Sequence, residues 1–589
     1  MLAAILASPR RSPNGDDASS SSSSSSIPRG VLPLVLGVAL LIRVATSTHP
    51  HSGESAPPLY GDYEAQRHWM EITTSLPLRE WYVHAPGKGN DMMYWGLDYP
   101  PLTAYQSYAY GKVIGAVDPE TTALMSSRGH ESYRSKLLMR LSVLLSDVVF
   151  VFPATLLFAR AHYARESPAR RTWAVALATL APAQILIDHG HFQARSRPHW
   201  FPYDRYNGIS LGLTVYAVAA IVADHELLGS ALFALAMNHK QMSAYYAPAF
   251  FAYLLGRCLR RERPLLEIVK LGAVVIGVFA TLWAPFYLSG GAGWTGVLTV
   301  LRRLVPLQRG LYEDYVANFW CATAPAFKWK RVLSVPTSAR VATFATIAAL
   351  LPSALRTIKT PTKDAFLWCL SCSAFAFFLF SFQVHEKSAL LPLLPATLLS
   401  LRAPTLAARL PLAVCFSCYP LLERDGLSLA YVGVMGAFAS VIGGGAPPPP
   451  SGGGGGGGEG EGEGERERRW WGRVDAVSAA AFVVAHAAAI FVPPPASLPH
   501  LHALAFTSSA FVYFAGAAAY CHARLWAETA AERAASRIFG ETKERCRGDP
   551  DVLRRVGEKF AAAAAAGGEA RDRRGARAST RARRKQHAE

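Results

Sequence analysis

The sequence has few charged residues for its length: only 17% of its 589 residues are Asp, Glu, Lys or Arg, whereas 51% are hydrophobic. A water-soluble protein carries about 25% charged residues. Cysteine is also sparse and scattered, and the Cys369-x-x-Cys372 and Cys415-x-x-Cys418 pairs lie in apolar runs without His or carboxylate partners. These cysteines are interpreted as small apolar helix residues. The sequence therefore predicts neither a disulfide framework nor a zinc site.

The net charge of +18 is distributed in a way that does not suit nucleic-acid binding. Basic residues gather after about residue 522 and in three short loops between apolar runs, at 160–171, 257–263 and 356–363. Lys and Arg in short loops mark the cytoplasmic side of a membrane protein. We therefore predict no nucleic-acid partner, and we use the basic loops to assign the two sides of a membrane.

Apolar windows near the ~20 residues that a helix needs to cross hydrocarbon recur along the whole chain. Runs this long and continuous fit helices, because a spanning segment must satisfy its backbone polar groups internally. The sequence predicts an all-α polytopic membrane protein with about fourteen transmembrane helices, of which 226–237 is the shortest and could instead be re-entrant. The expected spans are 31–46, 137–159, 172–188, 208–223, 226–237, 243–256, 264–288, 338–354, 366–382, 388–402, 407–423, 427–442, 474–492 and 500–521.

The segments outside these spans are of low complexity at both ends and near residue 450. Residues 1–29 are predicted to be a disordered Ser-rich cytoplasmic tail, 443–472 a Pro/Gly/Glu-rich cytoplasmic linker, and 522–589 a basic cytoplasmic tail. Between them lie a transmembrane catalytic module at 30–442, which includes the polar loop 47–136, and the last two transmembrane helices at 473–521. With fourteen spans, both termini and the basic loops share the cytoplasmic side.

The unusual polar stretches all fall on the side opposite the basic loops. They are the loop 47–136, Asp188-His189-Gly190-His191-Phe192-Gln193, the turn 238–241, the segment 289–337, and Gln383-Val384-His385-Glu386-Lys387. Ionisable groups at a membrane boundary are costly without a purpose. We therefore expect one site assembled from several loops on this face.

Asp62 and Glu64 form an Asp-x-Glu pair that follows the first span after a short polar stretch. A positioned carboxylate can act as a general base on a hydroxyl group. Equally, Asp62 can be the N-cap of a helix that begins near Glu64. Spacing alone does not choose between these two roles.

Several stretches together resemble the family of endoplasmic-reticulum glucosyltransferases that use dolichyl-phosphate-glucose to extend the lipid-linked N-glycan precursor. They include Gly61-Asp62-Tyr63-Glu64-Ala65-Gln66-Arg67-His68-Trp69, Leu97-Asp98-Tyr99-Pro100-Pro101, Asp188-His189-Gly190-His191-Phe192-Gln193 and Gln383-Val384-His385-Glu386-Lys387. The resemblance covers most of 55–440 and implies a GT-C type helical bundle in the reticulum membrane, with a luminal active site. It also implies dolichyl-linked lipid substrates, no cofactor and metal-independent transfer.

The resemblance implies that Asp62 is the catalytic base and that Glu64 orients it or binds the acceptor. Arg67, His68 and Trp69 are then candidates for binding acceptor sugar hydroxyls, although Trp69 can equally anchor an interfacial helix. Asp98 and Tyr99 lie in a stretch that Pro100 and Pro101 make stiff, and they are candidates for acceptor contact or a rigid helix entry.

Cationic and imidazole side chains on this face are candidates for binding the donor phosphate and sugar, because a leaving phosphate needs fixed positive charge. They are His189, His191, Gln193, Lys240, Arg302, Arg303, His385 and Lys387. His189-x-His191 also suits a metal, but no third ligand with suitable spacing follows. Arg302 and Arg303, on an expected interfacial helix at 294–305, can equally contact lipid headgroups.

The implied reaction is inverting transfer of glucose to a nine-mannose dolichyl-pyrophosphate oligosaccharide, because Asp62-Tyr63-Glu64-Ala65-Gln66-Arg67-His68-Trp69 resembles the branch that adds the first glucose. The branch that adds the second glucose is the alternative, and a lipid or sugar transporter is an alternative of another class. A transporter predicts charged residues within its helices and internal repeats, and neither is evident. Residues 194–205 interrupt the resemblance, as a genuine insertion or a gene-model error.

Overall fold

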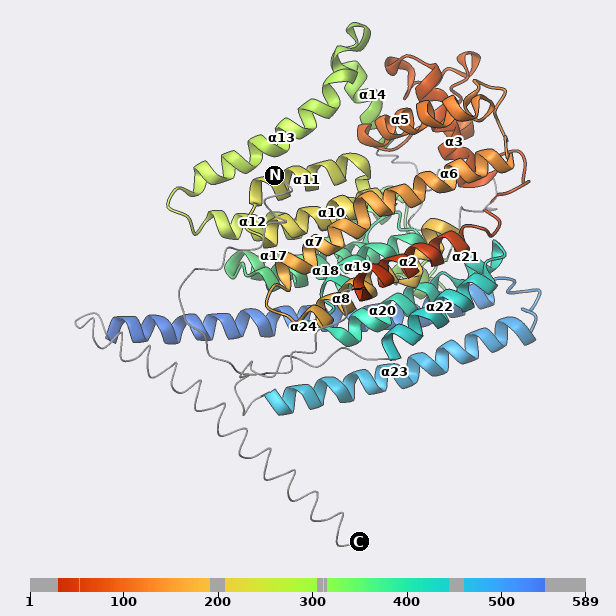
Figure 1. The fold of residues 1–589 in the computed structure, drawn as a ribbon. Coiled ribbons are helices and arrows are strands. Elements are labelled where there is room, and N and C mark those ends of the chain that lie inside the picture. The colour runs from red at the N-terminus through yellow and green to blue at the C-terminus, as the bar shows by residue number, and fades with distance from the viewer. Residues whose placement is uncertain are drawn as a thin grey trace.

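The structure of the chain is a computed structural model that describes residues 30–51, 53–190, 207–304, 311, 315–443 and 460–545. Within these ranges every regular element is a helix or helical turn (Figure 1), and a single antiparallel bridge joins Ala85 to Asn90. The predicted all-α class is therefore confirmed. His191, Gln193, the 194–205 stretch and the two predicted tails, up to residue 29 and after residue 545, lie outside the described residues.

The N-terminal half begins with one apolar helix, continues with a polar helical segment and ends with a series of apolar helices. Its helices are α2 Val31–Thr46, α3 Gly61–Ser75, α4 Met92–Trp95, α5 Pro101–Val117, α6 Tyr133–Ser146, α7 Phe152–His162, α8 Pro168–Thr179, α9 Pro182–Ile185, α10 Asn207–Val222, α11 Glu226–His239 and α12 Ala247–Cys258. Its 3₁₀ turns are η1 Leu78–Glu80, η2 Pro86–Lys88, η3 Pro119–Thr122 and η6 Gln241–Tyr246, and its π-helical turns are η4 Asp147–Val151 and η5 Leu186–Gly190.

The C-terminal half continues the apolar series and contains the longest helices. They are α13 Pro264–Leu288, α14 Trp294–Leu304, α15 Phe319–Thr323, α16 Trp329–Val332, α17 Val335–Lys359, α18 Lys363–Phe380, α19 Leu390–Leu398, α20 Pro404–Ser417, α21 Tyr419–Arg424, α22 Ser428–Gly443, α23 Gly460–Phe491 and α24 Leu501–Arg545, with the 3₁₀ turns η7 Ser289–Gly291 and η8 Glu386–Ala389. Prolines at the first position start α8, α13 and α20, because their fixed φ suits a helix and they need no intrahelical donor there.

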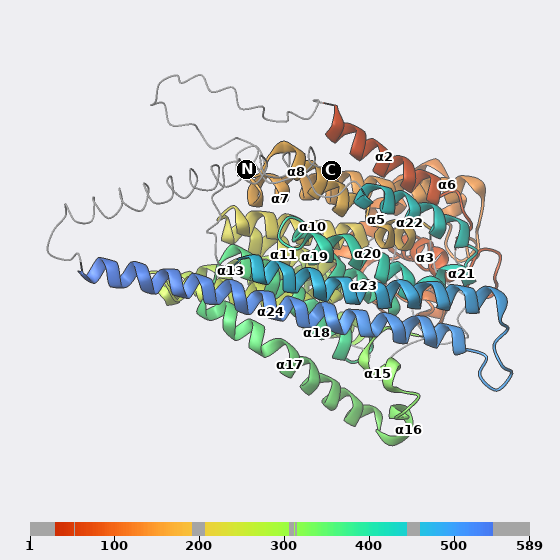
Figure 2. The ribbon, with the colours of Figure 1, turned by 90° about the horizontal axis from the view of Figure 1, so that it is seen from below.

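Every expected span coincides with one helix or with consecutive helical elements, and the helices form one layered bundle. α10 packs between α7 and α11, and α18 packs between α17 and α24, around a continuous apolar core (Figures 1 and 2). Six described helices are long and apolar enough to cross a membrane: Tyr133–His162, Pro264–Gly291, Val335–Lys359, Lys363–Phe380, Trp471–Phe491 and Leu501–Arg533. Four more, α2, α10, α20 and α22, are apolar but shorter. The chain is an all-helical membrane protein.

The polar segment 47–136 folds into a helical lobe at one end of this bundle, beside α14 (Figure 1). α3 and α5 pack closely, because a Cβ on Gly111 of α5 would lie 2.7 Å from the Thr74 side chain of α3. An aromatic cluster that includes Trp69 and Trp81 joins the lobe to Phe286 at the end of α13. The lobe thereby holds α3, and Asp62 with it, against the bundle.

Two helices extend well beyond the expected transmembrane spans. α23 begins at Gly460, so part of the expected 443–472 linker is helical, and α24 continues beyond the expected span to Arg545. The expected interfacial helix at 294–305 corresponds to α14.

Candidate functional site

Asp62 lies in the first turn of α3 and faces a lysine from the other half of the chain. Its carboxylate Oδ2 is 3.3 Å from the Nζ of Lys387 in η8, and both side chains are almost completely buried. The N-cap of α3 is Tyr60, with a left-handed backbone and no side-chain cap. The alternative role of Asp62 as N-cap is therefore wrong. A buried carboxylate beside an ammonium is suited to accept a proton at a fixed place.

Glu64 and Arg67 form the centre of a buried charge network within the lobe. Arg67 donates through Nε and one terminal nitrogen to the two Glu64 oxygens, at 2.6 Å each, and also to Glu71 Oε2 at 2.6 Å. Tyr94 Oη donates to Glu64 at 2.7 Å, and Arg67 also donates to the Thr121 carbonyl at 3.0 Å. Glu64 and Arg67 therefore form these hydrogen bonds with other residues of the lobe.

The electrostatics of this network favour its charged forms. Burial opposes ionisation of Glu71, but the hydrogen bond from His68 and the charge of Arg67 lower the pKa of Glu71 to about 2. Burial also opposes the charge on Arg67, yet Glu64 and Glu71 raise the pKa of Arg67 above its ordinary value. The phenol pKa of Tyr94 is raised by burial and by the adjacent Glu64 charge.

The side chains of His68 and Trp69 lie in different environments: His68 lies beside a carboxylate, and Trp69 lies in an aromatic cluster. His68 Nδ1 lies 3.0 Å from Glu71 Oε2, while its buried Nε2 has no hydrogen-bond partner among the described residues. Trp69 Nε1 donates to the Trp95 carbonyl at 3.0 Å, and its ring packs on Tyr99 in the aromatic cluster. His68 thus keeps a nitrogen for a ligand, whereas Trp69 packs inside the lobe rather than at an exposed interface.

The Asp98–Pro101 stretch connects the lobe to two other loops. Arg303 of α14 donates to the carbonyls of Gly96 and Leu97 at 3.3 Å each, and Gln241 donates to the Asp98 carbonyl at 3.4 Å. Burial raises the pKa of Tyr82 far above its usual range, as does the Asp98 charge, and the Arg303 charge lowers it. The charges of Asp98 and Arg303 therefore both lie close enough to Tyr82 to affect its phenol group. Arg302, in contrast, is exposed.

Lys240 and the start of α10 are joined to the Asp188–Gly190 turn. Lys240 Nζ donates to Asn207 Oδ1, and Asn207 Nδ2 donates to Asp188 Oδ1 at 2.6 Å. This contact brings together the two flanks of residues 191–206. Lys240 is therefore connected to the predicted donor-binding stretch 188–193 only through Asn207, which bonds Asp188.

His189 is paired with residues that the sequence reasoning missed. Its Nε2 lies 2.9 Å from Asp147 Oδ2, and Arg43 Nε donates to the same oxygen at 2.5 Å. Arg43 and Asp147 lie in apolar runs, so the expectation that the helices carry no internal charge is wrong. A lone Arg and a lone Asp within such runs were the signal, because ionisable groups there are rare and usually paired.

The structure joins Asp62 to Lys387, and it joins the Asp98 stretch to Arg303 and Gln241. It does not bring Glu64 and Arg67 to an open surface, and it leaves Arg302 exposed. His385 is the half-buried residue immediately before η8, two positions from Lys387. Asn207, Gln241 and Glu71 were not among the predicted site residues, because polar residues of ordinary type carry no distinctive pattern.

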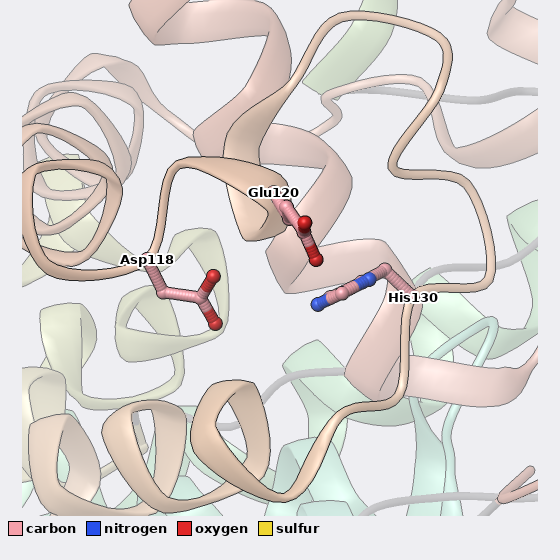
Figure 3. A group of neighbouring side chains, drawn as sticks. All are labelled: Asp118, Glu120 and His130. Carbon is pink, nitrogen blue, oxygen red and sulfur yellow. The ribbon is translucent and has the colours of Figure 1, made fainter.

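One group of side chains in the described part has a geometry that could hold a metal ion. Single ligand atoms of Asp118, Glu120 and His130 lie within 4.8 Å of one another, and Figure 3 shows them directed toward a common space. Asp118 already accepts a hydrogen bond from Thr121, His130 pairs with Ser132, and Glu120 is exposed. None of these bonds goes to Asp62 or Lys387, and metal-independent transfer stays a prediction.

Comparison with known proteins gives a consistent result. The model of the ALG6, ALG8 glycosyltransferase family matches residues 37–520. A protein of Arabidopsis thaliana, named probable dolichyl pyrophosphate Man9GlcNAc2 alpha-1,3-glucosyltransferase, is 51% identical over 397 residues, which cover 67% of this chain and 71% of that protein.

Two further relatives, one from a bird and one from a yeast, carry the same name without "probable". The relative from Gallus gallus is 42% identical over 407 residues, covering 68% of this chain and 76% of its own length. The relative from Saccharomyces cerevisiae is 39% identical over 409 residues, covering 68% of this chain and 71% of its own length.

Proposed function

Because the chain belongs to the ALG6, ALG8 glycosyltransferase family, we propose that it transfers the first glucose, in α-1,3 linkage, to the dolichyl-pyrophosphate-linked Man9GlcNAc2 oligosaccharide. The relatives whose names specify this acceptor support the proposal. The donor is dolichyl-phosphate-glucose. The contact between Asp62 and Lys387 is the single structural observation that carries the mechanism.

The transfer proceeds by direct attack with inversion at the glucose anomeric carbon. The terminal mannose hydroxyl forms the new bond to this carbon while the bond to the donor phosphate oxygen breaks. Asp62 takes the hydroxyl proton, because its carboxylate is the one held at the start of α3 beside a fixed cation. The departing phosphate monoester keeps the bonding electrons and carries the developing negative charge.

The cations of the other loops are arranged to receive that charge. Lys387 follows His385 in the same turn, and Arg303 reaches the backbone before Asp98 from α14. Fixed positive groups in a water-poor site stabilise a developing anion without reorganising at the moment of reaction. These residues and Lys240 therefore bind the donor phosphate, His189 contacts the donor sugar, and no metal is needed.

The lobe residues have a supporting part in this proposal. Glu64 and Arg67 hold α3 rigid through their mutual ion pair, so they orient Asp62 rather than touch sugar. His68, through its available Nε2, and Asp98 with Tyr99 are proposed acceptor contacts. Supporting residues are distinguished from acceptor contacts by whether their polar groups already form hydrogen bonds within the lobe.

The membrane arrangement follows from the fourteen expected spans. We place the chain in the endoplasmic-reticulum membrane as a GT-C type bundle, with the lobe and the Asp62 site luminal and the basic loops cytoplasmic. An Asn-x-Ser acceptor introduced at the exposed Lys88–Gly89 turn should become glycosylated in reticulum membranes, and one introduced in loop 257–263 should not. Glycosylation of the latter alone would reverse the topology.

Glucose transfer by the purified protein tests the function. Dolichyl-phosphate-glucose is supplied with the nine-mannose acceptor or with an acceptor that already bears one glucose, and the chelator EDTA is added to one series. The proposal expects transfer to the first acceptor, unaffected by EDTA, and loss in Asp62→Asn with retention in the control Asp118→Asn. Transfer only to the second acceptor selects the sister enzyme, and equal activity of Asp62→Asn removes Asp62 from the mechanism.

A further inference from the structure

Three ionisable side chains from three helices meet inside the bundle, away from Asp62. Asp147 Oδ2 in the π-turn η4 accepts from Arg43 Nε of α2 at 2.5 Å and lies 2.9 Å from His189 Nε2 in the π-turn η5. At most 1% of each side chain is exposed. We call Arg43, Asp147 and His189 the buried triad.

This arrangement is expensive as a purely structural device. Removing two charges from water costs several kcal/mol each, and a well-packed apolar pair often stabilises a fold as well. Ionisable groups within membrane helices, and π-turns within helices, occur mainly at functional sites. Both Asp147 and His189 lie in such turns.

The contacts determine which imidazole nitrogen carries the proton. The guanidinium of Arg43 keeps Asp147 as a carboxylate, which can only accept hydrogen bonds. His189 Nε2 must therefore be the protonated nitrogen, and a neutral ring then has an acceptor lone pair on Nδ1. That Nδ1 is buried and has no hydrogen-bond partner among the described residues.

The surroundings hold this geometry from both sides. Arg140 donates to the main-chain carbonyl of His189 at 2.8 Å, and a Cβ on Gly208 would lie 2.5 Å from Asp147 Oδ1, so α10 closes tightly on the carboxylate. The residue before His189, Asp188, binds Asn207 and through it Lys240. The turn that holds His189 is thus connected by hydrogen bonds to Lys240.

We propose that Arg43 and Asp147 are positioning residues that lock His189 as its Nε2–H tautomer, so that Nδ1 accepts a hydrogen bond from a hydroxyl group of the sugar substrate. This inference rests on the proposed glucosyl transfer. It assigns a role to two charged residues that do not touch the reacting atoms.

Asp147→Asn is the first variant, because it preserves shape while allowing the side-chain amide to donate to Nε2 and reverse the tautomer. Transfer is measured as kcat and as KM for dolichyl-phosphate-glucose, beside thermal unfolding in detergent. The proposal expects kcat to fall at least about tenfold, as for a misplaced binding group. Because this variant leaves Arg43 buried without its ion pair, its stability also falls.

The double variant Arg43→Met/Asp147→Leu separates positioning from stability. It removes both charges, leaves none uncompensated and fills the space with apolar atoms, so its melting temperature should recover toward that of the wild type. Its kcat should stay at least about tenfold low, because His189 still lacks the carboxylate that fixes its tautomer. Recovery of kcat together with the melting temperature would show a purely structural triad and overturn the proposal.

A second Asp–His–Arg group provides the matched control. Asp364 lies 3.0 Å from His162 Nε2 and 2.9 Å from Arg402 at the start of α18, whereas His385 and Lys387 follow the other end of that helix. Asp364→Asn should lower the melting temperature and leave kcat unchanged, and an equal kcat loss in both asparagine variants would overturn the specific role of Asp147. Absence of transfer by the wild type would instead contradict the proposed function.

Discussion

The Nζ of Lys387 lies 3.3 Å from the carboxylate of Asp62, although 325 residues separate them in the chain. The contact joins the start of α3 in the lobe to the turn η8 between two apolar helices of the bundle. Because both side chains are buried, the pair is shielded from solvent and its geometry is fixed. The proton acceptor and a phosphate-binding cation of the proposed reaction thus occupy one place.

This pair predicts a strongly non-additive double-mutant cycle. Asp62→Asn should lower kcat at least about 100-fold, because it removes the proposed general base. Lys387→Met should also lower kcat, but adding it to Asp62→Asn should cost much less than it does alone, since the two groups act as a unit. Lys136→Met, which breaks the part-exposed Lys136–Glu54 pair at 2.9 Å, is the control and should leave kcat unchanged. Additive losses would contradict a shared role.

The lowered pKa of Glu71 predicts an acid-sensitive lobe. The folded state favours the carboxylate, so the stability that it contributes is complete above its ordinary pKa of 4.5 and is lost as pH falls toward about 2. The depression corresponds to roughly 3 kcal/mol at neutral pH. Glu71→Gln should be less stable than the wild type at pH 7, and the difference should shrink as pH falls below 4.5. Melting temperatures in detergent between pH 7 and pH 3 measure it, and parallel curves would refute the linkage.

Arg67 should not be replaceable by lysine. Its guanidinium binds both oxygens of Glu64 and also Glu71, a fork that an ammonium cannot reproduce. Arg67→Met leaves two buried carboxylates without their cation and should destabilise the protein by about 3–5 kcal/mol. Arg67→Lys should fall between Met and the wild type. Arg79→Lys, at a largely exposed arginine, is the control and should change the melting temperature little.

Gly208 should not tolerate alanine. The added Cβ would lie 2.5 Å from Asp147 Oδ1, so either α10 or the carboxylate must move, at a cost of about 1–3 kcal/mol. Gly433 in α22 has no atom within 4 Å of its Cβ position, and Gly433→Ala should be neutral or stabilising by up to about 1 kcal/mol. Thermal unfolding of the two variants compares them directly, and equal effects would argue against close packing at Asp147.

Deleting residues 194–205 should preserve the fold. The bond between Asn207 and Asp188 at 2.6 Å brings the flanks together, and the remaining residues 191–193 and 206 can span up to about 13 Å. Equal or higher kcat and melting temperature in the deletion variant would agree with a gene-model error. A loss of transfer with unchanged stability would instead show that the inserted residues take part in the site.

The sequence by itself determined the fold class and predicted which polar stretches would contribute to a site. Long apolar runs require helices in a membrane, so all fourteen expected spans coincide with helices of the structure. Asp62 and Lys387 stood out because ionisable groups beside apolar runs are costly. Family resemblance then supplied their roles, which spacing could not.

Only the tertiary structure decided which of these polar residues meet. Hydrophobic periodicity is local, whereas the partner of a buried charge is set by how distant helices pack, so no pattern could pair Asp62 with Lys387 or Asp147 with His189. For the same reason Glu64 and Arg67, expected beside the sugar, are found bonded to each other within the lobe. The sequence determined where charge must be paired, and the packing of the helices selected the partners.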